Sequence, residues 1–153
     1  MYKKILVPVD GSTTSDRGFD EALKLAKPLG ASLLLLHVVD TYPMVTGMEM
    51  ATADTWQQVS DGLRSHGQSI LEQAHAAAIA QQVAVENRMA EGNQGRVADV
   101  IVEVAKSNHC DLIVMGTHGR RGLSKLALGS DADRVTRLST VPVLLVRHAS
   151  AND

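Results

Sequence analysis

The sequence predicts an α/β protein, a Rossmann-like fold with a five-stranded parallel sheet and helices on both faces. Five short apolar runs alternate with longer segments of helical periodicity, which is the pattern of repeated βαβ units. Four of these runs are almost continuous in Val, Ile and Leu, as expected for parallel strands that are covered on both faces. Each intervening segment is long enough for a right-handed crossover. The predicted order is therefore βαβαβαβαβ.

The five expected strands are Lys4–Val9, Ser32–Val39, Val83–Ala90, Asp111–Met115 and Val143–Arg147. The third is more polar than the others, which favours a place at a sheet edge. The last is apolar on both faces. An exposed apolar strand at an edge tends to pair with another chain.

Four helices are expected between these strands. The first has Ser12 or Thr13 as its N-cap and Gly30 as its stop. The second covers about Asp54–Gln82, the third carries an apolar face across Val97, Val100, Ile101 and Val104, and the fourth begins at Ser130 with Val135 and Leu138 on one face. The irregular segment Asp40–Ala53 is either a mobile flap at the carboxyl edge of the sheet or a plain surface loop.

Composition excludes several classes of function. The formal net charge of −2 provides no overall field for nucleic acid or an anionic membrane. Cys110 is the only cysteine, so an intrachain disulfide is excluded, and we expect it to pack as a small apolar residue. No apolar run approaches the ~20 residues that span a bilayer, and the N-terminal run is too short for a signal sequence. We therefore expect one cytoplasmic domain over residues 1–153.

A glycine-rich segment follows the apolar run Leu112–Met115. It extends from Gly116 to Ser130 and combines four glycines and the hydroxyl of Ser130 with the cationic side chains of Arg120, Arg121 and Lys125. Glycines permit positive φ and let backbone N–H groups converge on an anion, and the N-terminus of the helix at Ser130 would attract a phosphate. The alternative is that the glycines only permit a long connection and that Ser130 is an N-cap. The segment matches neither the P-loop nor the GxGxxG pattern.

The spacing Gly116-x2-Gly119-x9-Gly129-Ser130 resembles the ATP-binding pattern of the universal stress protein family. The likeness extends over the whole chain, through Ile5-Leu-Val-Pro-Val-Asp10, Leu36-His-Val-Val39, Asp111-Leu-Ile-Val-Met-Gly116 and Val141-Pro-Val-Leu-Leu-Val146. On these motifs the chain is identified as a member of that family.

The resemblance implies a sheet of order 3-2-1-4-5, with an adenine nucleotide lying across the first and fourth strands. It also implies a homodimer, consistent with the apolar edge strand Val143–Arg147. Carried over position by position, it places Pro8, Val9, Asp10 and Val38 around the nucleoside, Met115 and Gly116 beside the ribose, and Gly119, Gly129 and Ser130 around the phosphates. The implied ligand is ATP, or ADP or AMP, with magnesium.

Four further residues carry hypotheses of their own. Asp10 would hold the nucleoside or would only form an Asx turn before the first helix. Arg120, or one of its cationic neighbours, would contact phosphate. Asp131 stands where the family often has a small or apolar residue. It would favour its helix by about 0.3–1 kcal/mol, and it would either repel a polyphosphate or recruit its metal. His118 is expected to be an exposed loop residue.

These observations predict a nucleotide-binding stress or regulatory protein whose bound ATP changes its affinity for an unknown regulatory protein partner. A nucleotide-independent dimeric interaction module is the first alternative, and a slow ATPase is the second. No HExxH or GxSxG pattern indicates a zinc enzyme or a hydrolase. We expect a binding protein, with slow ATP hydrolysis at most.

Overall fold

The structure is a computed structural model that describes residues 1–41, 52–92, 96–118 and 128–147. Its elements are β1 (Lys4–Pro8), α1 (Thr13–Leu29), β2 (Ser32–Asp40), α3 (Ala53–Ala80), β3 (Val85–Gly92), α4 (Val97–Ser107), β4 (Leu112–Gly116), α5 (Ser130–Leu138) and β5 (Val143–Val146). The strands form one parallel sheet of order β3-β2-β1-β4-β5. The predicted fold class and strand order are confirmed.

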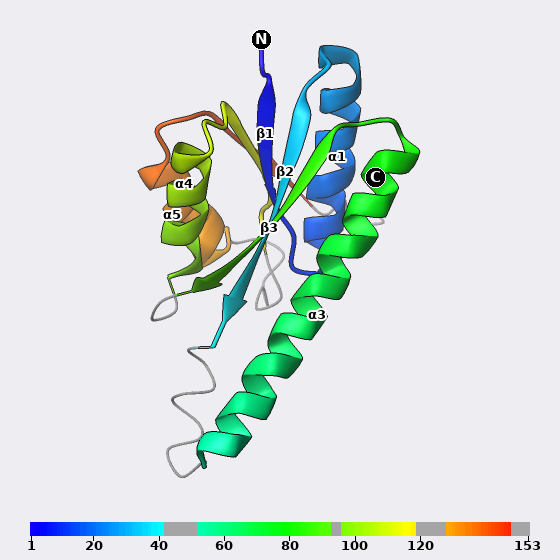
Figure 1. Ribbon diagram of the computed structural model, residues 1–153. Helices are drawn as coiled ribbons and strands as arrows, with labels where there is room; N and C mark the ends of the chain where they lie inside the picture. The colour runs from blue at the N-terminus through cyan, green and yellow to red at the C-terminus, as the bar shows by residue number, and fades with distance from the viewer. Residues whose placement is uncertain (42–51, 93–95, 119–127, 148–153) are drawn as a thin grey trace, which may run out of the picture.

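The two faces of the sheet carry separate cores. Helices α1 and α3 cover one face, and α4 and α5 cover the other (Figure 1). Alternate residues of each strand serve the two cores. On β1, Ile5 and Val7 pack toward α1 and α3, whereas Leu6 packs toward α4 and α5. This division explains why the central strands are apolar at nearly every position.

The largest error in the predicted strands is at β3, which begins and ends two residues later than expected. Gln82 has a φ of 62°, and the Val83 N–H donates to the carbonyl of Ala78 at the end of α3. Val83 therefore belongs to the turn that follows α3 and not to β3. At the other end β3 continues to Gly92, because main-chain pairing with β2 extends to Asp40 whatever the side chains are. The other strand ends differ from prediction by one residue at most.

Two apolar stripes are less buried than the periodicity suggested. In α5, Val135 is fully buried but Leu138 is 45% exposed, because the helix ends at Leu138 and the chain turns away there. In α3 the fully buried positions are Gly67, Leu71 and Ala78, and its N-terminal half extends beyond the sheet (Figure 1). The apolar positions that recur at helical spacing along α3 are therefore only half-buried: Val59, Leu63, Ile70, Ala74 and Ala77.

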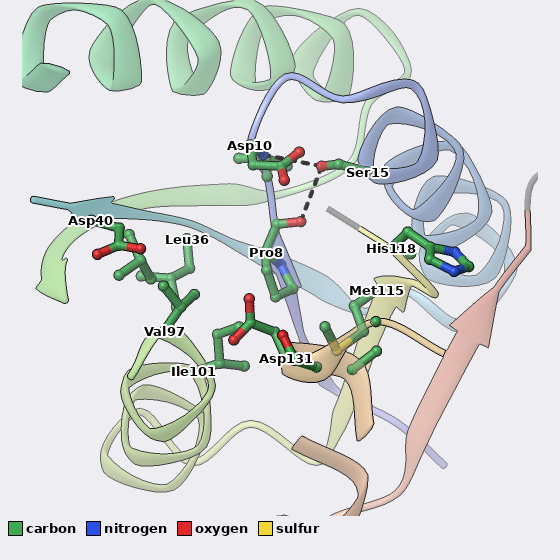
Figure 2. A pocket seen from close by; sticks show the side chains of 16 residues that line it. Pro8, Asp10, Ser15, Leu36, Asp40, Val97, Ile101, Met115, His118 and Asp131 are labelled. Atoms are coloured by element: carbon green, nitrogen blue, oxygen red, sulfur yellow. Dashed lines mark hydrogen bonds between the residues drawn. The ribbon is translucent and has the colours of Figure 1, made fainter. Parts of the chain in front are cut away.

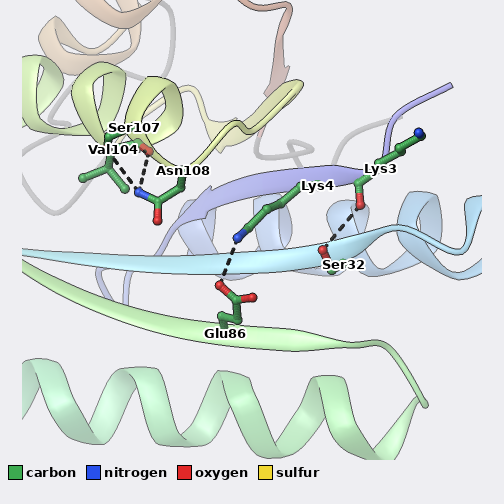
Figure 3. A network of polar contacts seen from close by, with 7 residues as sticks. All are labelled: Lys3, Lys4, Ser32, Glu86, Val104, Ser107 and Asn108. Carbon is green, nitrogen blue, oxygen red and sulfur yellow. Dashed lines mark hydrogen bonds and ion pairs between the residues drawn. The ribbon is translucent and has the colours of Figure 1, made fainter.

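Polar contacts hold the amino ends of the strands together. The carboxylate of Asp111 accepts the backbone N–H groups of Lys3 at 2.8 Å and Lys4 at 3.3 Å, which joins β1 to the start of β4. The Lys4 ammonium reaches across β2 to Glu86 of β3, with 2.9 Å between Nζ and Oε2 (Figure 3). Cys110 is buried beside this end, as predicted. These contacts lie at the end of the sheet opposite to the pocket described next, which is at the carboxyl ends of the strands.

Among the described residues, no helix combines the length and the apolar character needed to cross a membrane.

Candidate functional site

A pocket opens at the carboxyl ends of β1, β2 and β4, where the N-termini of α4 and α5 complete its wall (Figure 2). The chain passes from β1 to β2 on one side and reaches β4 on the other side of β1. This is the switch point at which open α/β sheets bind ligands. The lining residues are Pro8, Val9, Asp10, Ser15, Leu36, Val38, Asp40, Val97, Ile101, Met115, Gly116, His118, Gly129, Ser130, Asp131 and Ala132.

All the predicted site residues that the structure describes line this one pocket. They come from segments far apart in the sequence: Pro8, Val9 and Asp10, then Val38, then Met115 and Gly116, and finally Gly129, Ser130 and Asp131. Gly119 and Arg120 lie outside the described residues, as do Arg121 and Lys125. The juxtaposition required by the sequence hypothesis is present.

The turn after β1 is held by side-chain hydrogen bonds. Asp10 Oδ1 accepts the Ser12 N–H at 2.9 Å, so the Asx turn predicted as an alternative role of Asp10 is present. Ser12 caps α1 by accepting the Ser15 N–H at 3.2 Å. Ser15 Oγ accepts the Asp10 N–H at 3.1 Å and donates to the Pro8 carbonyl at 3.4 Å (Figure 2). This turn presents Asp10 to the pocket.

Gly116 is needed for close packing and not for positive φ. Among the described glycines only Gly11 and Gly30 have positive φ. A Cβ on Gly116 would lie 2.7 Å from the carbonyl oxygen of Thr14, and one on Gly18 would lie 3.0 Å from the Gly116 nitrogen. The start of α1 therefore rests directly on the end of β4. Gly116 is the last residue of the strand.

The N-terminus of α5 forms the rim of the pocket. Gly129 is the N-cap, with extended φ and ψ of −63° and 150° and no side-chain cap, so Ser130 is the first helical residue and not the N-cap. The Gly129 N–H donates to the Thr117 carbonyl at 2.9 Å, and a Cβ on Gly129 would lie 2.9 Å from that oxygen. The first intrahelical donor is Asp133. The preceding N–H groups and the helix dipole favour an anion here.

One wall of the pocket is apolar. Leu36 and Val38 project from β2 on the same face, and Val97 and Ile101 face them one turn apart on α4. Together they suit a flat apolar group such as a base. Of these four residues, sequence reasoning assigned only Val38 to the site. The two-residue period of the strand and the four-residue spacing of the helix were the signals available for the other three.

Other lining residues were also missed. Ser15, Asp40 and Ala132 line the pocket but belong to no motif that the sequence analysis recognised. Asp40 could have been found because it lies two residues after Val38 and so shares its face of β2. His118 is half-buried and not exposed, and its Nδ1 lies 3.0 Å from the Thr117 hydroxyl. Its ring points away from Pro8 and Asp131 in Figure 2.

A buried histidine supports the floor of the pocket from behind. His37 is 3% exposed, and its Nδ1 lies 2.8 Å from the Val9 carbonyl oxygen. Since a carbonyl only accepts, Nδ1 carries the donated proton. A Cβ on Gly67 of α3 would lie 2.3 Å from His37 Cδ2. The glycine therefore allows α3 to pack against the ring that holds the Val9 backbone.

Three carboxylates line the pocket: those of Asp10, Asp40 and Asp131. Among the lining residues within the described ranges there is no Lys or Arg. Behind Asp10, burial raises the pKa of Asp16, and the charges of Asp10 and Asp20 raise it further. The charged side chains in the described part of the pocket are thus acidic, and its positive potential comes from the N-termini of α4 and α5.

An ion pair joins the two helices of the wall. Arg134 Nε donates to Asp99 Oδ1 at 2.8 Å, and Nη2 donates to Oδ2 at 3.1 Å. This bidentate hydrogen bonding from Arg134 lowers the pKa of Asp99. It holds the first turn of α4 beside α5, at the side where Val97 and Ser130 line the pocket.

An open parallel sheet with a pocket at its switch point defines a Rossmann-like protein. The sequence model of the universal stress protein family matches residues 1–147, and the chain belongs to this family. It is 37% identical over 147 residues to Universal stress protein MJ0531 of Methanocaldococcus jannaschii, covering 96% of this chain and 83% of that relative.

Solved structures agree with this assignment. The structure of the hypothetical protein MJ0577 from Methanocaldococcus jannaschii has a TM-score of 0.83 at 26% identity, with 99% of each chain covered. A universal stress protein in complex with cAMP has a TM-score of 0.66 at 26% identity, with 95% of this chain and 97% of that chain covered.

Proposed function

We propose that this chain is a universal stress protein that binds an adenine nucleotide, with ATP, ADP and AMP as candidates, and acts in stress response or regulation. The observation that carries the proposal is the single pocket that gathers Pro8, Asp10, Val38, Met115 and Gly129 at the switch point of the sheet. The related structure in complex with cAMP supports a ligand of this class.

The geometry suggests how the nucleotide would lie. The base would rest against the apolar wall of Leu36, Val38 and Ile101. The ribose would sit between Asp10 and the end of β4, where a carboxylate can accept hydrogen bonds from hydroxyls.

The phosphates would then meet the N-terminus of α5 at Gly129 and Ser130, whose N–H groups and dipole favour anions. Gly119 and Arg120 would complete this end. Magnesium would accompany the phosphate oxygens, with the Ser130 hydroxyl beside them.

Nucleotide binding would change the affinity of this chain for protein partners. We propose a homodimer formed through the β5 edge, residues Val143–Arg147, because this strand is apolar, Leu144 is 37% exposed and edge strands pair with other chains. Val146 pairs with Gly116, the last residue of β4 at the pocket, so a change at the pocket has a short route to this edge. The cytoplasm is the proposed compartment.

Isothermal titration with ATP, ADP and AMP, with and without magnesium, tests the proposal. We expect Asp10→Asn to weaken binding by about tenfold, since the amide preserves the Asx turn but removes a charge-assisted acceptor. Asp20→Asn on the exposed face of α1 is the matched control and should leave binding unchanged.

Two outcomes would contradict the proposal. A folded dimer that binds none of the three nucleotides would favour the nucleotide-independent interaction module. Single-turnover hydrolysis that is lost in Asp10→Ala, with binding retained, would instead favour a slow ATPase.

A further inference from the structure

The balance of charge in the pocket bears on which nucleotide it accepts. Its carboxylates come from three elements: Asp10 follows β1, Asp40 ends β2 and Asp131 stands in the first turn of α5. Among the described lining residues, the helix N-terminus at the proposed phosphate end is that of α5. A polyphosphate placed there would share the pocket with these three carboxylates.

Asp131 is the carboxylate nearest in sequence to the proposed phosphate contacts. It is the second residue of α5, directly after Ser130. Figure 2 shows its carboxylate on the pocket side of the helix, beside Ile101. A carboxylate in the first turn interacts favourably with the same N–H groups and dipole that would receive a ligand phosphate. Asp131 and a phosphate therefore compete for the positive potential of this helix N-terminus.

We propose, on the basis of the nucleotide-binding function above, that Asp131 determines how many phosphates this pocket accepts and makes it favour adenosine monophosphate over ATP. The electrostatic reason is the charge of the two further phosphoryl groups of ATP. Consider one negative charge on Asp131 and one on a phosphoryl group, about 8 Å apart. Their repulsion changes a binding constant roughly 2-fold in a water-like dielectric and roughly 30-fold at the lower effective dielectric of a protein surface. Asp131 is exposed, so the lower part of this range applies.

Titration of adenosine, AMP and ATP into the full chain tests this inference. In Asp131→Asn we expect ATP to bind about three- to tenfold more tightly, AMP to gain less and adenosine to be unchanged within about twofold. The ratio of the ATP and AMP dissociation constants should fall accordingly. The difference between variant and wild type should shrink as salt rises from 50 to 500 mM, because screening shortens the range of the repulsion.

Asp133→Asn is the matched control. Asp133 is also an acid in the first turn of α5, but it does not line the pocket. It should leave the ATP to AMP ratio unchanged. Asp131→Ser provides a second neutral side chain at the same position, and thermal unfolding of each variant checks that it is folded.

The results separate the inference from the function on which it rests. An unchanged ATP to AMP ratio in both Asp131 variants would overturn the inference while leaving nucleotide binding intact. Weaker ATP binding in those variants, only with magnesium present, would show instead that Asp131 recruits the metal, and would also overturn it. Absence of binding by adenosine, AMP and ATP to wild type and variants alike would overturn the proposed function itself.

Discussion

The contact between Gly67 and His37 makes a sharp prediction about stability. An alanine inside a helix is normally about 1 kcal/mol more stable than a glycine. At Gly62 of α3, where a Cβ would meet nothing within 4 Å, Gly62→Ala should realise this gain. At Gly67 the same methyl group would lie 2.3 Å from His37 Cδ2 and 2.7 Å from Nε2. One of the two elements must then move.

The cost of that movement outweighs the gain in helix propensity. Forcing an extra methyl group into a packed core costs about 1–3 kcal/mol. The His37 ring is buried and donates to the Val9 carbonyl, so displacing it also risks an unsatisfied buried group, which costs about 1–3 kcal/mol. After subtracting the helix gain, Gly67→Ala should lower the free energy of unfolding by about 1–5 kcal/mol.

Urea unfolding followed by far-ultraviolet circular dichroism measures both variants. Gly62→Ala should raise the midpoint and Gly67→Ala should lower it, with equal slopes. In a His37→Ala background the steric part of the Gly67→Ala effect should disappear, which a double-mutant cycle detects. If the Gly67→Ala variant were as stable as the Gly62→Ala variant, the reasoning would be refuted, because the two sites would then not differ in packing.

Three further changes have expected outcomes. Ser15→Ala should cost about 1–3 kcal/mol in urea unfolding and weaken nucleotide binding, because the Asp10 N–H loses its acceptor in a buried turn; unchanged stability would contradict this. Asp99→Asn should lower the urea midpoint at pH 7. The hydrogen bond from Arg134 lowers the folded-state pKa of Asp99. The stabilisation by the Asp99 carboxylate is therefore present above its unfolded-state pKa and is lost as pH falls through its folded-state pKa. The stabilities of wild type and variant should consequently converge in acid. Burial raises the pKa of Cys110 to about 11, so the folded protein should resist iodoacetamide at pH 8 and react after unfolding, as mass spectrometry would show.

Local elements were predictable because their signals are local. Hydrophobic periodicity located the strands and helices to within about two residues, and Ser12 and Gly30 marked the ends of α1 as expected. The Asx turn at Asp10 also follows from a few neighbouring residues. The residues that line the pocket were predicted as one site only because the spacing from Gly116 to Ser130 resembled a known family.

The remaining features depend on which segments meet. Nothing in the sequence near Gly116 shows that a helix roughly 100 residues earlier in the chain rests on it. Nothing near Gly67 shows that it lies against His37, or that Asp40 shares a pocket with Asp131.

The sequence by itself determined the secondary structure, the βαβ order and the family, because period, caps and motif spacing are properties of short stretches of chain. The tertiary structure decided why Gly116 and Gly67 must be glycines, and that the pocket combines one helix N-terminus with three carboxylates. Close approach and electrostatic balance depend on distances between elements that are remote in sequence, and these distances exist only once the sheet and its two helical layers have packed.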